Sequence, residues 1–78
     1  MNKISIEFFG MLIEVTGQKN IVLENIGDTE SLKLHINDLF PDLEQQTYIL
    51  ALNNKIVANN TIILHNSNVA CMPPFAGG

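Results

Sequence analysis

Residues 27–41 read Gly27-Asp28-Thr29-Glu30-Ser31-Leu32-Lys33-Leu34-His35-Ile36-Asn37-Asp38-Leu39-Phe40-Pro41. Asp28 is a favourable N-cap, and Glu30 lies in the first turn, where the helix dipole favours a negative charge. Apolar residues recur at the i, i+4, i+7, i+8 spacing of a core-facing stripe, which comprises Leu32, Ile36, Leu39 and Phe40. Pro41 ends the pattern, because the residue before a proline is pushed out of helical geometry. The segment predicts one principal helix with one buried face.

Two strands and a short helix are predicted before this segment. Residues 3–9 and 20–25 alternate between apolar and polar, as in strands with one buried face. Phe9 lies in phase with the polar side of its strand, which is unusual for a large aromatic residue. Between the strands, Met11, Leu12 and Val15 share a helical face, and Gly17 can cap that helix. The inward-facing strand residues are Ile4, Ile6, Phe8, Ile21 and Leu23.

Three strands are predicted after the principal helix. Residues 48–53 form the first, with Tyr48, Leu50 and Leu52 on one side, and the pair Asn53-Asn54 suits a tight hairpin turn. Residues 55–57 form a short strand, which we expect at an edge. Residues 68–72 are apolar on both faces at Val69-Ala70-Cys71-Met72, which favours a central strand. One sheet with one principal helix on one face is an α+β layout, and the 78 residues make a single domain, 1–78.

Composition excludes several classes of function. The formal net charge is −4, and the four basic residues, Lys3, Lys19, Lys33 and Lys55, are scattered. Because nucleic acid binding needs clustered Lys and Arg, we expect no nucleic acid partner. We expect no secretion signal at the N-terminus and no membrane-spanning stretch. One cysteine permits no internal disulfide, so we expect a reducing, cytoplasmic location.

The polar residues before position 73 form no catalytic constellation and no metal-ligand spacing. We interpret His35, beside the apolar stripe, as a partly buried structural residue and His65 as a solvated turn residue. Cys71 is interpreted as a small buried hydrophobe, since a reactive thiol would need exposure and a low pKa. Asp42 and Glu44 are expected to solvate a loop.

The C-terminal residues carry the strongest indication of chemistry: Met72-Pro73-Pro74-Phe75-Ala76-Gly77-Gly78. The prolines make a stiff, extended exit from the domain, and we expect residues 73–78 to form a flexible tail. A Gly-Gly end has no side chains and can enter a narrow channel. Its carboxylate is ionised at neutral pH and could attack a phosphorus atom of ATP to form an acyl-adenylate. The alternative interpretation is a frayed terminus without function.

The whole chain resembles the ubiquitin-like β-grasp sulfur carriers, most closely the small-subunit family of molybdopterin synthase. The resemblance rests on Ile4-Ser5-Ile6-Glu7-Phe8-Phe9-Gly10, the capped helix from Asp28, Leu50-Ala51-Leu52-Asn53 and, most specifically, Pro73-Pro74-Phe75-Ala76-Gly77-Gly78. The family often has Gly-Asp-Glu before the last strand, where this chain has Asn66-Ser67-Asn68. The resemblance implies a β-grasp fold, with a mixed sheet of four to five strands, one main helix on one face and a short helix.

The resemblance also implies a reaction cycle for the tail. An adenylyltransferase similar to ubiquitin-activating enzymes would adenylate Gly78 with ATP and magnesium, and a sulfurtransferase would convert the adenylate to a thiocarboxylate. The carrier would then dock on the large, catalytic subunit of molybdopterin synthase, in a heterotetramer, and pass sulfur to a pterin precursor. In this cycle the chain binds no cofactor and has no catalytic side chain of its own, and Gly77 supplies steric clearance.

Docking residues are implied at the base of the tail. Phe9 and Phe75 are expected to anchor the large subunit, together with Pro73, Pro74 and Ala76, and Val22 and Met72 to extend the patch. The alternatives are that Phe9 tucks under the loop to Met11 and that Phe75 packs on its own domain. For the whole chain, the alternatives are a sulfur carrier of another pathway (thiamine, amino acid or tRNA thiolation) and a non-reactive β-grasp adaptor.

Overall fold

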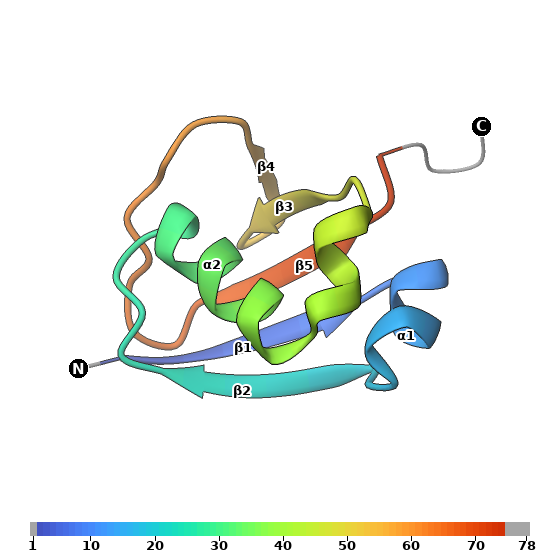
Figure 1. Cartoon of the computed structure of the whole chain (residues 1–78). Coiled ribbons are helices and arrows are strands. Elements are labelled where there is room, and N and C mark those ends of the chain that lie inside the picture. The colour runs from blue at the N-terminus through green and yellow to red at the C-terminus, as the bar shows by residue number, and fades with distance from the viewer. Residues whose placement is uncertain (1, 75–78) are drawn as a thin grey trace.

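A computed structural model describes residues 2–74, and these fold as one mixed sheet with helices on one face (Figure 1). Five strands lie in the order β2-β1-β5-β3-β4. Their bounds are β1 Lys3–Phe8, β2 Asn20–Glu24, β3 Ile49–Leu52, β4 Lys55–Val57 and β5 Asn68–Met72. β1 and β5 are parallel, and the other neighbouring pairs are antiparallel. The predicted central position of residues 68–72 and the predicted edge position of residues 55–57 are both confirmed.

The main element of the helical layer is α2, Thr29–Leu39, which connects β2 to β3 and lies across one face of the sheet (Figure 1). The predicted short helix is α1, Met11–Thr16, and it lies within the β1–β2 connection. Gly17 caps α1 in the left-handed conformation, as expected. This arrangement is the α+β, β-grasp architecture that the sequence predicts.

The core lies between α2 and the inner face of the sheet. Fully buried side chains include Ile4, Ile6, Phe8, Leu12, Leu32, Ile36, Leu50, Val69 and Cys71. The ring of Phe8 packs edge-on against Phe40, with 5.7 Å between the ring centroids. The prediction that Leu39 faces the core is wrong, because its side chain is 48% exposed. The chain leaves helical geometry at Phe40, and this turn brings Phe40 rather than Leu39 against the core.

Two parts of the core were not predicted. A 3-10 helix, η1, spans Pro41–Gln45 and buries Leu43, so Asp42 and Glu44 lie on a helical turn rather than in a loop. Ile26 and Ile63 are also buried. The side chain of Asn2 links the segments that contain Ile26 and Ile63. Its Nδ2 donates to the carbonyl oxygens of Ile26 and Ile63, and its Oδ1 accepts from the Ile26 N–H.

The turns depend on asparagine. Asn53 and Asn54 have φ values of 49° and 72°, which forms the tight β3–β4 hairpin that the sequence predicts. Asn66 has φ 64° and takes the left-handed conformation in the turn before β5. Asn66 therefore supplies the left-handed conformation that this turn requires, as expected for an asparagine.

Asp28 is confirmed as the N-cap of α2. Its Oδ1 accepts a hydrogen bond of 2.9 Å from the Ser31 N–H, and its Oδ2 accepts one of 3.2 Å from Asn60 Nδ2. Bonds from Ser31 and then from Asn60 hold the pKa of Asp28 below its ordinary value of 3.8. A carboxyl with a lowered pKa in the folded state stabilises the fold above the unfolded-state pKa and loses that effect as pH falls.

The variant Asp28→Asn should therefore melt at a lower temperature than the parent chain at neutral pH. It keeps an acceptor for Ser31 but removes the charge that the helix N-terminus favours. The difference should shrink as pH falls below about 4, where the parent carboxylate takes up a proton. Thermal melts followed by circular dichroism between pH 7 and pH 3 measure it, and Asp42→Asn is the control for net charge. A difference in melting temperature that is constant with pH would contradict this assignment.

Candidate functional site

The exit of the tail is built by the central strand. β5 pairs with β1 on one side and β3 on the other and ends at Met72. The Phe9 N–H donates to the Cys71 carbonyl at 3.0 Å, so the two strands remain paired up to the exit. Pro73 is half-buried and Pro74 is exposed. The other predicted tail residues, Phe75, Ala76, Gly77 and Gly78, lie outside the described residues, and their roles stay predictions.

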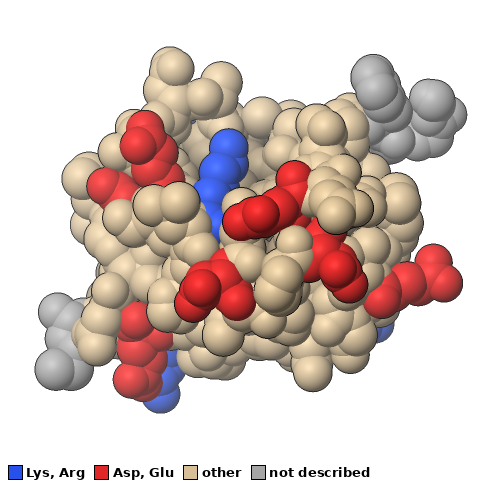
Figure 2. All heavy atoms as spheres, viewed as in Figure 1, with Lys and Arg blue, Asp and Glu red and all other residues tan. Residues whose placement is uncertain are grey.

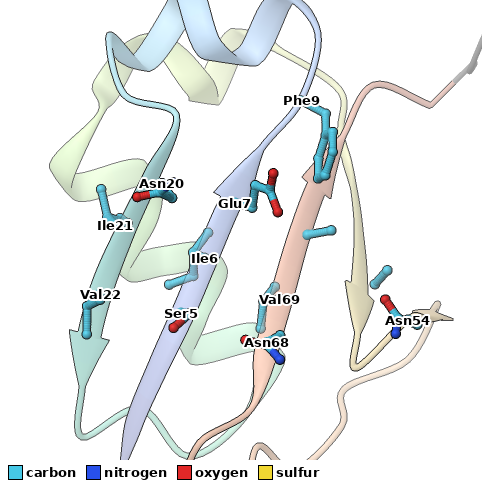
Figure 3. A pocket seen from close by; sticks show the side chains of 12 residues that line it. Ser5, Ile6, Glu7, Phe9, Asn20, Ile21, Val22, Asn54, Asn68 and Val69 are labelled. Atoms are coloured by element: carbon cyan, nitrogen blue, oxygen red, sulfur yellow. The ribbon is translucent and has the colours of Figure 1, made fainter.

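The face of the sheet opposite α2 is uncovered and holds a shallow hollow (Figure 3). One row of cross-strand neighbours runs across it from Asn20 through Glu7, Ala70 and Ala51 to Ile56. Ala51 and Ala70 have only methyl side chains, so the surface is hollowed at the centre of this face. This face could therefore receive a protruding side chain of a partner.

Polar and apolar side chains both line the hollow; the polar ones are Ser5, Glu7, Asn20, Asn54 and Asn68 (Figure 3). Phe9 lines it beside the end of β5 and is 39% exposed, whereas its neighbour Phe8 is wholly buried on the other face (Figure 3). Val22 is 58% exposed, as its outward phase predicted. Ile56 is 66% exposed and was missed, because a three-residue strand is too short to show an alternation. The exposed apolar face adjoins the point where the tail leaves the domain.

The model of the ThiS family matches residues 6–78. The chain belongs to the ThiS family. Three solved structures show how widely its fold is shared. A putative molybdopterin converting factor subunit 1 from Pyrococcus furiosus has a TM-score of 0.89 at 14% identity, over 96% of this chain and 100% of that one. Small archaeal modifier protein 1 of Haloferax volcanii has a TM-score of 0.83 at 17% identity, with coverage of 96% and 100%.

The third is a complex of subunits 1 and 2 of the molybdopterin-converting factor from Helicobacter pylori. The matched chain has a TM-score of 0.73 at 23% identity, over 97% of this ThiS-family chain and 99% of that one. At these identities the matches establish the shared β-grasp fold. No curated protein matches the chain. The family and the sulfur-carrier fold that the sequence resembles are thus confirmed.

The hollow on the open face of this ThiS-family chain carries little charge. Figure 2 shows acidic side chains spread over the helical face, with few basic ones among them. Among the described residues that line the hollow on the opposite face, only Glu7 is charged. Burying charge is costly, so the open face is the better candidate for a close protein contact.

Cys71 is a core residue, as predicted. Its side chain is wholly buried, and burial raises the pKa of the thiol to about 12, although the charge of Lys33 acts in the opposite direction. Burial also raises the pKa of Tyr48 to about 12, and its hydroxyl donates to Asn37 Oδ1 at 3.0 Å. Neither group is placed to act as a nucleophile or base at neutral pH.

The two histidines differ from each other in the structure. The prediction that His35 is partly buried is wrong: position 35 faces solvent, because the buried stripe of α2 passes through Leu32 and Ile36 on the other side. His65 is exposed, as expected, and its Nδ1 accepts a hydrogen bond from the Lys3 N–H at 3.1 Å.

Within residues 2–74, no group of three or more potential metal ligands lies together, and no helix is long and apolar enough to span a membrane.

Proposed function

We propose that the chain is the sulfur carrier and small subunit of a molybdopterin synthase. The observation that carries this proposal is where the tail begins: the central strand β5 ends at Met72 and leads into Pro73-Pro74, which precede Gly77-Gly78 in the sequence. The structural similarity to two chains described as subunit 1 of the molybdopterin-converting factor supports this pathway.

The proposed chemistry takes place at Gly78. A carboxylate oxygen attacks the α-phosphorus of ATP on an adenylyltransferase, with magnesium, and pyrophosphate leaves. Hydrosulfide (HS⁻), supplied at the sulfide oxidation level by a sulfurtransferase, then displaces AMP from the acyl-adenylate, which gives a terminal thiocarboxylate. On the large synthase subunit this sulfur passes to the pterin precursor, and water attacks the acyl carbon, so that Gly78 is released as its carboxylate. Cys71 takes no part, because a buried thiol with a raised pKa supplies almost no thiolate.

The proposed docking surface is the open face of the sheet together with the base of the tail. Phe9, Val22 and Met72 supply apolar area, and Ala51 and Ala70 leave a hollow for a partner side chain. Large aromatic residues at the centre of a contact contribute most of its binding energy. The complex of subunits 1 and 2 from Helicobacter pylori supports a large-subunit partner for this chain. A cytoplasmic location accompanies the proposal, because the reaction needs ATP and because a single free cysteine suits a reducing compartment.

The second candidate is a carrier that serves another acceptor. Similarity to small archaeal modifier protein 1 favours this candidate, in which the activated Gly78 is joined to a protein. The two candidates share adenylation and differ in the acceptor. A carrier for thiamine, amino acid or tRNA thiolation would also share adenylation, whereas an inert adaptor would not.

The test is an incubation of the full chain with an adenylyltransferase, ATP, magnesium and a sulfurtransferase, followed by intact mass measurement. The product should be heavier by the replacement of one oxygen with sulfur, and fragmentation should locate the sulfur at Gly78. A Cys71→Ala chain should give the same product. Addition of the large subunit and pterin precursor should return the original mass. Sulfur found on Cys71, or a thiocarboxylate that no pterin precursor discharges, would contradict the proposal.

A further inference from the structure

We propose that Gly10 is a positioning residue: it provides a seat for the Pro73 ring and thereby sets the direction in which the tail leaves the domain. Its effect on sulfur transfer rests on the proposed function. The seat itself is a structural feature that can be measured without any sulfur chemistry.

The seat exists because position 10 has no side chain. Gly10 has φ 58° and ψ −137°, a backbone conformation that L-residues other than glycine rarely adopt. A Cβ built there would lie 3.1 Å from Pro73 Cγ and 3.6 Å from Pro73 Cδ. The first distance is shorter than ordinary carbon contacts of about 3.5–4.0 Å, so the ring would have to move away.

Gly10 is held firmly on both sides. Before it, the Phe9 N–H bonds to the Cys71 carbonyl at 3.0 Å, which ties the residue to the end of β5. After it, the Ile13 N–H bonds to the Gly10 carbonyl at 3.1 Å, and Leu12 of the same helix is buried in the core. The seat is therefore tied by hydrogen bonds to both β5 and α1 of the folded domain.

A fixed seat matters because the reacting group is far from it. A Cβ at position 10 would require the Pro73 ring to shift by a few tenths of an ångström, and the resulting change in mean direction grows along residues 73–78, which span at most about 20 Å. Misplacement of a reacting atom by about 1 Å can reduce a rate about 100-fold. The prolines transmit the direction set at the seat, because each has a fixed φ.

The chain offers a matched control at the other end of α1. Gly17 also has a positive φ, of 73°, but a Cβ there would meet nothing within 4 Å. Gly10→Ala and Gly17→Ala therefore both add a methyl group at a positive-φ glycine, and only the first contacts Pro73. Gly17 has ψ 11° and lies in the left-handed α region, which L-residues adopt more readily than the Gly10 conformation, so a Pro73→Ala background is needed to separate contact from backbone strain.

The first experiment measures direction. Residual dipolar couplings of the amides of residues 75–78 are recorded for the parent chain and both variants. Gly10→Ala should change these couplings, and Gly17→Ala should leave them unchanged. Equal couplings in all three chains would overturn the proposal.

A second variant, Pro73→Ala, keeps the proposal testable if Gly10→Ala does not fold. It removes Cγ and Cδ, so Gly10→Ala added to it should lower the melting temperature much less than it does in the parent chain. If Gly10→Ala causes the same loss, or the same failure to fold, in both backgrounds, then its cost is backbone strain alone, and the proposal is wrong.

The second experiment measures consequence. With saturating adenylyltransferase, Gly10→Ala should lower the rate of adenylate formation about 10-fold, while the dissociation constant for the partner stays within about twofold. Gly17→Ala should change neither. If no adenylyltransferase activates the parent chain, the proposed function is refuted. The residual dipolar couplings would still test whether Gly10 sets the direction of the tail. Loss of affinity at an unchanged rate would overturn the positioning role.

Discussion

Removal of Gly78 should abolish adenylate formation and sulfur transfer, while the melting temperature of the domain stays unchanged. The expected loss is complete because the terminal carboxylate would end on Gly77, one residue short of the proposed reaction site. The fold should be unaffected, since the described core contains no residue after Cys71. The chain is incubated with the adenylyltransferase, ATP, magnesium and the sulfurtransferase, and its intact mass then shows whether sulfur has been added. A thermal melt measures the stability of the fold.

Two further variants test separately the position of the terminal carboxylate and the width of the tail. An alanine added after Gly78 keeps the full tail but moves the terminal carboxylate from Gly78 to a residue that has a side chain. Activation should again be lost. Gly77→Val keeps the carboxylate and should allow docking, while its branched side chain blocks a narrow channel. A chain without Gly78 that still sulfurates the pterin precursor would refute the mechanism.

Phe8→Ala and Phe9→Ala should have opposite effects, although the two residues are adjacent. Phe8 is wholly buried and packs edge-on against Phe40, so its truncation should cost about 3–5 kcal/mol of folding free energy. Small domains have about 5–15 kcal/mol in total, so this variant should be barely stable. Phe9 lies on the open face, and its truncation should weaken binding to the large subunit by about 2 kcal/mol or more at a nearly unchanged melting temperature.

Urea denaturation and isothermal titration with the large subunit measure the two effects. Val22→Ala, at the far side of the same face, should weaken binding less than Phe9→Ala does. If Phe9→Ala lowers stability strongly and leaves binding unaltered, Phe9 belongs to its own domain, and the open face is not the docking surface.

Local patterns in the sequence were enough to predict the architecture of the domain and its family. Alternation in residues 3–8 and the apolar stripe at Leu32 and Ile36 reflect the local periods of strand and helix, which depend on neighbouring residues alone. The continuous apolarity of Val69-Ala70-Cys71-Met72 placed β5 at the centre of the sheet. The tail motif indicated the family, which the match over residues 6–78 confirms.

The tertiary structure decided which distant residues meet. Burial of Leu43, Ile26 and Ile63 and exposure of Leu39 depend on how η1 and the loop after β4 pack, and no local period contains that information. The open face likewise needs pairing across strands, because only the register places Ala51, Ala70 and Ile56 in one row. The contact of Gly10 with Pro73 joins residues 63 positions apart, at a glycine that the sequence shows only as a break between strand and helix. Long-range packing sets these features, because each requires two segments to arrive at one place with complementary shapes.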